Sequence, residues 1–334
     1  MSAIPKEARS ILADGDFCYL AAAALSGPHL TPVVFAFDGG RLWITTSRGS
    51  VKAKVWRGNP SVAGLVRVGD RAVTFRGRVR TYDALDPFTW PLAVVGSGRL
   101  LRAATRFALK NARFFFGYAV DATEIPLAWT PPGRIFNGVE LRAGRVLDLT
   151  TGDDLGGWGP WETNGAPASS GRRRGTGSAA TTAGAGRAAL ARALARGVPA
   201  SVLGGLGTSG EGVMALRPEP DAGPLTVLPV RWSFGKGDGS FEARLPSAML
   251  ALAPTGSAPV AGLTVDQAST WRARRMRGML IRGPALVSRP RGRRAGAEGA
   301  VVVRPEQVVW WEGWTSGTAH LAGPRARRAM RDPA

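Results

Sequence analysis

Short apolar runs, separated by Gly, Pro and Asp, recur along the chain and predict antiparallel strands. Residues 33–37 and 41–45 flank Asp38-Gly39-Gly40, a sequence typical of a β-hairpin turn. Apolar residues at helical spacing predict short amphipathic helices at 6–13 and 188–196, followed by apolar strands at 17–22 and 200–203. This pattern favours antiparallel β-barrels over a parallel sheet, in a mainly β protein with a few helices.

The two halves of the chain carry the same landmarks in the same order, which predicts a degenerate tandem duplication. Pro32 and Pro229 are 197 residues apart in matching apolar runs. The paired segments are Thr31–Phe35 with Leu228–Trp232, Ser61–Leu65 with Pro259–Leu263, and Phe75–Gly77 with Ile281–Gly283.

The stretch between the two copies differs in composition from the rest of the chain. Gly, Ala, Ser and Thr dominate it and no apolar period is present, as in a flexible linker. We therefore expect a first domain at 1–150, a linker at 151–186, a second and degenerate domain at 187–323, and a basic tail at 324–334.

Two segments depart from the strand pattern. Residues 96–118 have helical spacing, with a basic face that includes Arg99, Arg102 and Arg106. We interpret this insert as an amphipathic helix that covers a barrel end, and a basic lid over an anionic ligand is the alternative. Near the C-terminus, residues 301–314 read as a Trp-rich hairpin whose tryptophans pack in the core or lie near a cofactor (Trp310, Trp311 and Trp314).

The most informative motif lies between Leu42 and Leu65. It reads as a strand, a turn rich in Thr and Ser, a basic helix start, Asn59-Pro60, and another strand. Hydroxyl groups and backbone N–H groups at a helix N-terminus favour an anion, and a nearby ammonium adds a full charge. Lysine is scarce in this chain, yet Lys52 and Lys54 both lie here, so we expect a phosphate at this turn.

These residues carry a resemblance to a known family. The ordered set of 32–40, Thr45-Thr46, Gly49-Ser50-Val51-Lys52, Asn59-Pro60 and 73–79 resembles the pyridoxamine 5'-phosphate oxidase-like family of flavin-binding split barrels. The resemblance covers about residues 5–85 well and 86–150 loosely. Many members have Arg immediately before the Lys, where this chain has Val51.

The resemblance implies two split β-barrels in tandem that form an intrachain pseudo-dimer, because such barrels usually pair with the cofactor in the crevice between them. It implies FMN as the cofactor, with a deazaflavin that has an acidic polyglutamate tail as the alternative and heme as the least favoured. The implied cofactor-binding residues are Val33, Val34 and Phe35 along the ring system, Thr45, Thr46, Ser50 and Lys52 at the phosphate, and Lys54 and Arg76 as neutralising charges. In the second copy, Met249 stands where the 197-residue offset places Lys52, so that barrel is expected to be mainly structural.

Composition limits the other classes of function. A single Cys18 excludes a disulfide framework and a multi-cysteine zinc site within the chain, and two histidines cannot build a His-rich metal cage, so no metal site is expected. We expect a cytoplasmic protein with no membrane partner, because no segment approaches 18 consecutive apolar residues and the N-terminus lacks a signal pattern.

The net charge of +20 favours contact with polyanions, but it is spread thinly and no nucleic-acid-binding motif is present. The favoured function is a flavin- or deazaflavin-dependent oxidoreductase of a small molecule, working as a monomer with an internal pseudo-dimer or as a homodimer. The alternatives are a non-catalytic cofactor-binding or sequestering protein with decayed sites and, less favoured, a polyanion-binding protein. The sequence identifies neither catalytic residues nor a substrate.

Overall fold

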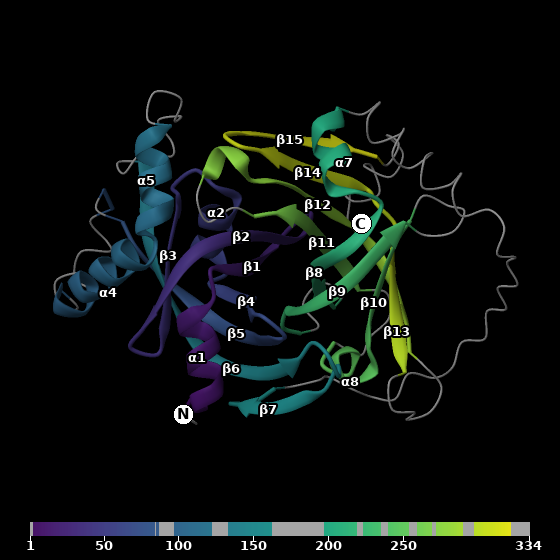
Figure 1. The fold of residues 1–334 in the computed structure, drawn as a ribbon, viewed down its shortest axis with the longest axis horizontal. Helices are drawn as coiled ribbons and strands as arrows, with labels where there is room; N and C mark the ends of the chain where they lie inside the picture. The colour runs from purple at the N-terminus through teal and green to yellow at the C-terminus, as the bar shows by residue number, and fades with distance from the viewer. Residues whose placement is uncertain are drawn as a thin grey trace, which may run out of the picture.

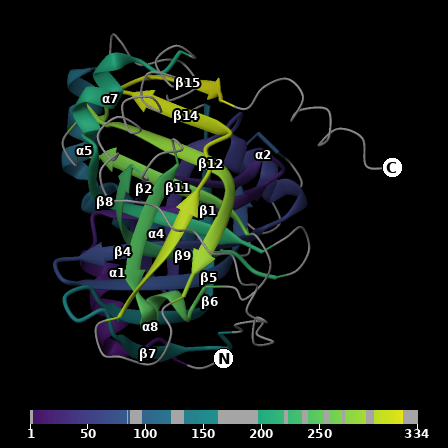
Figure 2. The same cartoon turned by 90° about the vertical axis from the view of Figure 1, so that its right-hand side faces the viewer.

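A computed structural model shows two β-barrels packed side by side, the first drawn from purple to teal and the second from green to yellow (Figure 1). Figure 2 gives the view at right angles, in which strands of the two barrels overlap. The structure describes residues 3–83, 85–86, 97–121, 133–161, 197–218, 223–234, 240–253, 259–268, 272–289 and 297–321.

The first barrel is a closed antiparallel sheet of six strands in the order β3-β2-β1-β4-β5-β6, with β6 pairing back onto β3. The predicted hairpin turn at Asp38-Gly39-Gly40 is confirmed, because Gly39 and Gly40 have φ of 58° and 74°, a conformation that favours glycine. A seventh strand, β7, extends the sheet beyond β6. The strands are β1 (Phe17–Ala24), β2 (Gly27–Asp38), β3 (Arg41–Ser47), β4 (Ser61–Val68), β5 (Arg71–Tyr82), β6 (Arg134–Asp148) and β7 (Asp154–Trp158).

In the part of the chain that the structure describes, four helices accompany this barrel. The amphipathic helix α1 (Lys6–Asp14) buries Ala8, Ile11 and Leu12 in the core of the first barrel. Helix α2 (Val51–Gly58) connects β3 to β4. The insert between β5 and β6 forms two helices, α4 (Ser97–Lys110) and α5 (Ala112–Val120), which project from the barrel on the left of Figure 1.

The second barrel repeats the topology of the first. Its six strands run in the order β10-β9-β8-β11-β12-β13, closed by the pairing of β13 with β10, and β14 and β15 extend the sheet beyond β12. Strands β8 to β13 therefore correspond in order to strands β1 to β6 of the first barrel. The strands are β8 (Ser209–Arg217), β9 (Thr226–Phe234), β10 (Phe241–Pro246), β11 (Val260–Gln267), β12 (Arg277–Ser288), β13 (Glu298–Val303), β14 (Gln307–Glu312) and β15 (Thr315–His320).

The helices of the second half are shorter. Helix α7 (Ala200–Leu206) precedes β8 as α1 precedes β1, α8 (Ser247–Leu250) joins β10 to β11 as α2 joins β3 to β4, and the 3-10 helix η4 (Ala273–Arg275) precedes β12. The equal order of helices and strands, together with the shared landmarks in the sequence, establishes the tandem duplication.

Reciprocal contacts join the two barrels about a pseudo-twofold axis. Arg76 donates from Nε to Leu225 O at 3.1 Å and from Nη2 to Thr226 Oγ1 at 2.8 Å. Its counterpart Arg282 donates from Nε to Pro28 O at 3.1 Å and contacts His29 Nδ1. Leu225 lies 197 residues after Pro28, and 197 residues is the offset between the two copies. Each barrel's arginine therefore binds the equivalent backbone carbonyl of the other barrel.

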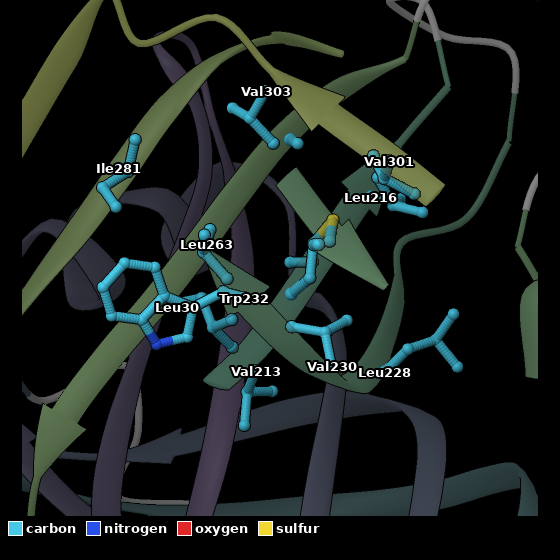
Figure 3. Close-up of a cluster of buried hydrophobic side chains, with 14 of the residues drawn as sticks. Leu30, Val213, Leu216, Leu228, Val230, Trp232, Leu263, Ile281, Val301 and Val303 are labelled. Atoms are coloured by element: carbon cyan, nitrogen blue, oxygen red, sulfur yellow. The ribbon is translucent and has the colours of Figure 1, made fainter. Parts of the chain in front are cut away.

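The hydrophobic core is continuous across this interface. One buried cluster combines first-barrel residues such as Leu30 and Leu65 with the interior of the second barrel, and Figure 3 shows Leu30 beside Leu263 and Trp232. A separate cluster that includes Leu20, Phe35 and Phe75 fills the first barrel. The two barrels therefore form a pseudo-dimer within one chain.

Three sequence expectations differ from the structure. Residues 200–203, predicted as a strand, lie in helix α7, because Pro199 stands at the N-cap and Val202 and Leu203 point together into the core. Residues 154–158, predicted as linker, form β7 on the edge strand β6. The Trp-rich hairpin is β14 with β15 rather than β13 with β14, since its turn is at Gly313.

The insert predicted near 96–118 is helical, as expected, but it is broken at Asn111 into two helices. The helix predicted at 188–196, residues 162–186 of the predicted linker and the tail at 324–334 lie outside the described residues.

Candidate functional site

The turn between β3 and α2 holds the hydroxyl groups that the sequence singled out. Ser50 is the N-cap of α2, and its Oγ accepts a hydrogen bond from the backbone N–H of Ala53 at 3.1 Å. Thr46 Oγ1 is hydrogen-bonded to the same Ser50 Oγ at 3.0 Å. Two hydroxyl groups therefore meet at the positive end of an eight-residue helix, where an anion is favoured.

Arg134 joins this turn from the other side and was missed by the sequence reasoning. It lies at the start of β6, paired with Ser47, and its guanidinium donates to Thr45 Oγ1 at 2.7 Å and to Thr45 O at 3.0 Å. No local signal marks Arg134, because only the closure of the barrel by β6 brings it to β3. Arg48, in the same turn, instead forms an ion pair with Asp83 that lowers the pKa of that carboxyl group.

Lys52 points into the first barrel rather than out of the turn. Its side chain is only 3% exposed, and Nζ donates to Thr31 Oγ1 at 2.6 Å and to Thr31 O at 3.3 Å. Burial lowers the pKa of Lys52 to about 7, and no carboxylate is among the causes of the shift. Lys54, two residues later, is exposed to solvent.

Strand β2 presents its two faces to different surroundings. Phe35 is fully buried inside the first barrel, and Val33 packs against the same core. Val34 and Ala36 point outward into a third cluster with Phe107, Phe114 and Ala273. The partly buried side chains around this third cluster are Phe17, Phe136, Met276 and Trp314.

The third cluster unites three parts of the chain that are far apart in sequence. Strand β2, the α4–α5 insert and the second barrel all contribute to it, so the outer face of β2 is a wall shared by both barrels. Trp314, one of the tryptophans singled out in the sequence, lies at its margin, whereas Trp310 and Trp311 pack against the core of the second barrel.

The nine candidate residues thus fall into separate places. Thr45, Thr46 and Ser50 lie together at the turn, with Arg134. Lys52 is turned inward, Lys54 outward, and Arg76 is an inter-barrel contact that also lies over the Trp161 ring at 4.2 Å. In the described structure the three hydroxyl residues therefore lie together at the turn, whereas the charged groups of Lys52, Lys54 and Arg76 lie elsewhere.

The second barrel has no equivalent of this turn. Helix α8 has only four residues, its N-cap is Pro246, and no side chain makes a capping hydrogen bond there. Met249 is buried in the core of the second barrel, at the place where the offset puts Lys52. The two barrels share a topology but not the helix N-terminus.

Comparison with known proteins agrees with the sequence motifs. Residues 4–107 match the family model of pyridoxamine 5'-phosphate oxidase, a span that runs from α1 through the β3–α2 turn into α4. The first barrel is thus similar to the pyridoxamine 5'-phosphate oxidase-like family over residues 4–107. The chain as a whole is a tandem of this split barrel, with a second, degenerate copy.

Several solved structures match part of this chain. A FAD-binding protein from Mesorhizobium loti has 18% identity and a TM-score of 0.29, over 44% of this chain and 94% of its own. An F420 reductase has 22% identity and a TM-score of 0.28, over 42% and 97% of the two chains. An FMN-binding, pyridoxamine 5'-phosphate oxidase-related protein from Nostoc punctiforme has 17% identity and a TM-score of 0.30, over 40% and 75%. No curated protein matches the chain.

Two further features bear on function. An open depression of about 550 Å³ lies against α4 and is lined by Asp38, Leu101, Arg102 and Arg106 among others, away from the β3–α2 turn. Within the described ranges, the helices are all too short or too polar to cross a bilayer.

Proposed function

We propose that the first barrel binds a flavin-type cofactor by its phosphate and uses it to oxidise or reduce a small molecule. The observation that supports this most is the pair of hydroxyl groups of Thr46 and Ser50 at the N-terminus of α2, inside the segment that matches the family model. FMN is the favoured cofactor, and a deazaflavin with an acidic tail is the alternative.

The residues at the turn fit a phosphate. Gly49 has open space where a Cβ would stand, so an oxygen can approach the backbone there. The first-turn N–H groups of α2 have no preceding carbonyl in the helix, and the hydroxyl groups of Thr46 and Ser50 can donate to an anion. Arg134 at Thr45 supplies the positive charge that the sequence had assigned to Lys52.

The ring system would lie at the margin of the third cluster, because Val34, Ala36, Phe107 and Phe114 already fill its centre. Phe136, Met276 and Trp314 are only partly buried there and would form apolar walls from both barrels. Such walls exclude water and offer aromatic faces or edges to a planar ring. When bound, the cofactor supplies the redox chemistry, and these residues would bind and orient it.

A non-catalytic cofactor-binding protein is the second candidate. It is favoured by Lys52, whose ammonium is bound to Thr31 inside the barrel rather than free for a phosphate, and by Val51 in place of the Arg found in many relatives. Under this candidate the first barrel binds the cofactor but does not turn it over. The net charge of +20 is the support for the lesser candidate, a polyanion-binding protein.

The first test is the absorption spectrum of the purified protein, with mass spectrometry of what acid releases and titration of the apoprotein with FMN and with a deazaflavin. We expect saturable binding of one of these and a spectrum of its oxidised form. A protein that binds neither cofactor would overturn the proposal. A bound cofactor that no electron donor reduces on the protein would favour the non-catalytic candidate.

A further inference from the structure

The α4–α5 insert uses only one narrow stripe to pack on the barrel. Ala103, Phe107, Asn111 and Phe114, spaced three or four residues apart, are its buried residues that face β2 and its neighbours. Asn111 fixes the bend between the helices, because its Nδ2 donates to Phe107 O at 2.8 Å and to Phe35 O at 3.2 Å. Most of the other described residues of the two helices are exposed.

The outer side of this insert is apolar as well. Leu101 and Leu109 on α4 are each 72% exposed, and Phe116 on α5 is 60% exposed. Phe115 and Val120 are also exposed on α5. A surface helix normally has a polar outer face, so five large apolar side chains in 20 residues mark a contact surface rather than chance exposure.

The charge on the same two helices has one sign. Residues 97–120 contain five basic residues and no Asp or Glu. Arg102 and Arg106 form ion pairs with Asp38 at 2.9 Å, yet their side chains remain 61% and 64% exposed. Lys110 is turned inward, where Nζ donates to Gly15 O at 2.7 Å. Arg102 and Arg106, which remain largely exposed, therefore lie on the same helix as the exposed Leu101 and Leu109.

We propose that the α4–α5 hairpin docks on an anionic membrane surface and holds the protein there peripherally. Exposed Leu and Phe side chains flanked by arginines on short helices are the chemistry that lies in a bilayer interface, with the apolar groups among the acyl chains and the guanidinium groups at the headgroup phosphates. A second copy of this chain is a poorer occupant, because two such hairpins would bring arginines of like charge together on a chain with a net charge of +20. The proposal stands independently of the cofactor.

The test is flotation of the full chain with vesicles of phosphatidylcholine, with and without phosphatidylglycerol. We expect binding only to the vesicles that contain phosphatidylglycerol, and weakening as salt is raised. The double variant Leu109→Ser/Phe116→Ser should bind at least about tenfold more weakly, because each substitution removes a large apolar side chain from the interface. The matched control, Leu155→Ser/Leu286→Ser, removes two exposed leucines outside the hairpin and should bind as the parent does.

All other results overturn the proposal. These are no binding to phosphatidylglycerol vesicles, equal binding to phosphatidylcholine alone, or an equal loss in the control variant. A change from dimer to monomer in the hairpin variant, measured by light scattering, would assign the surface to a second copy instead. Saturation of the same surface by DNA with no vesicle binding would assign it to a polyanion. Circular dichroism of each variant checks folding, which surface substitutions should leave intact.

Discussion

The two barrels of this chain share one topology but differ at the turn that leads into α2 and α8. Where the first barrel has the eight-residue helix α2 with a serine cap, the second has the four-residue α8 after a proline. Where the first buries Lys52 on Thr31, the second buries Met249 among apolar neighbours. The barrel topology therefore does not require a polar turn at this place, and the second copy fills it with packed apolar side chains.

The contacts between the barrels, in contrast to the turns, are alike in the two copies. Arg76 and Arg282 make the same backbone contact in opposite directions. Two further contacts between the barrels lie together near Tyr19: Arg67 pairs with Glu211 near the surface, and Tyr19 Oη donates to Asp266 at 3.4 Å in a more buried place. The two copies are therefore more alike in these arginine contacts than at the turns before α2 and α8.

The largest expected effect comes from breaking the reciprocal arginines. Arg282→Ala leaves Pro28 O and the His29 ring without their partner in a buried place, and Arg76→Ala does the same to Leu225 O and Thr226. We expect each to lower the free energy of unfolding by about 3 kcal/mol, from unsatisfied polar groups and lost side-chain packing. Urea unfolding followed by tryptophan fluorescence measures this.

The control for these variants is Arg244→Ala, whose side chain is exposed and pairs with Glu242. It should change stability little. If Arg76→Ala costs no more than Arg244→Ala while Arg282→Ala is costly, the two contacts are not equivalent and the comparison between the barrels fails at that point.

The next effect concerns the buried ammonium of Lys52. Its pKa is lowered to about 7, so the unfolded chain binds this proton more strongly, and the stability of the wild type should rise with pH above 7. Between pH 7 and 8.5 the rise should be about 2 kcal/mol, since each pH unit corresponds to about 1.4 kcal/mol for one proton. Lys52→Met, which copies Met249, should flatten this rise.

Denaturant midpoints at several pH values give the measurement. Lys110→Met is the comparison variant. Burial lowers the pKa of Lys110 to about 8, so its contribution to the rise of stability with pH comes mainly above pH 8. An unchanged slope in Lys52→Met would show that Lys52 is solvated in the folded protein. Retained FMN binding by Lys52→Met would exclude Lys52 from the phosphate site.

A smaller effect separates the two helix starts. Ser50→Ala removes one hydroxyl group from the proposed phosphate site and the cap of α2, so we expect FMN to bind about tenfold more weakly, the loss of one hydrogen bond to a charged group. Ser247→Ala, at the start of α8, should leave the affinity unchanged. Fluorescence titration measures both, and equal affinities in the two variants would move the phosphate away from α2.

The smallest effect lies at the interface. Burial raises the pKa of Asp266 to about 6, so its ionised form destabilises the folded state above that pH, and the cost disappears as the pH falls toward 4. Asp266→Asn should therefore raise the stability by about 1 kcal/mol at pH 8 and not at pH 4. Thermal unfolding at the two pH values checks this, and a loss of stability at pH 8 would contradict it.

Much of the fold could be predicted from local signals. The hairpin at Asp38-Gly39-Gly40 needs glycines with positive φ, and the start of α2 needs a residue such as Ser50 that can cap. The prediction failed at 200–203, because a short apolar run fits a strand and a helix equally well until its neighbours are known. The candidate site could be predicted only as far as the hydroxyl groups of the turn.

By itself, the sequence determined the order of strands and turns, the duplication and the cap of α2, since these depend on residues close together in the chain or on repeated landmarks. The tertiary structure decided which charges reach the turn. Arg134 lies at the turn because β6 closes the barrel by pairing with β3. Lys52 points inward and donates to the hydroxyl group of Thr31, and Arg76 donates to the second barrel. A long, flexible side chain is placed by the partners it meets after folding, and those partners are not its neighbours in sequence.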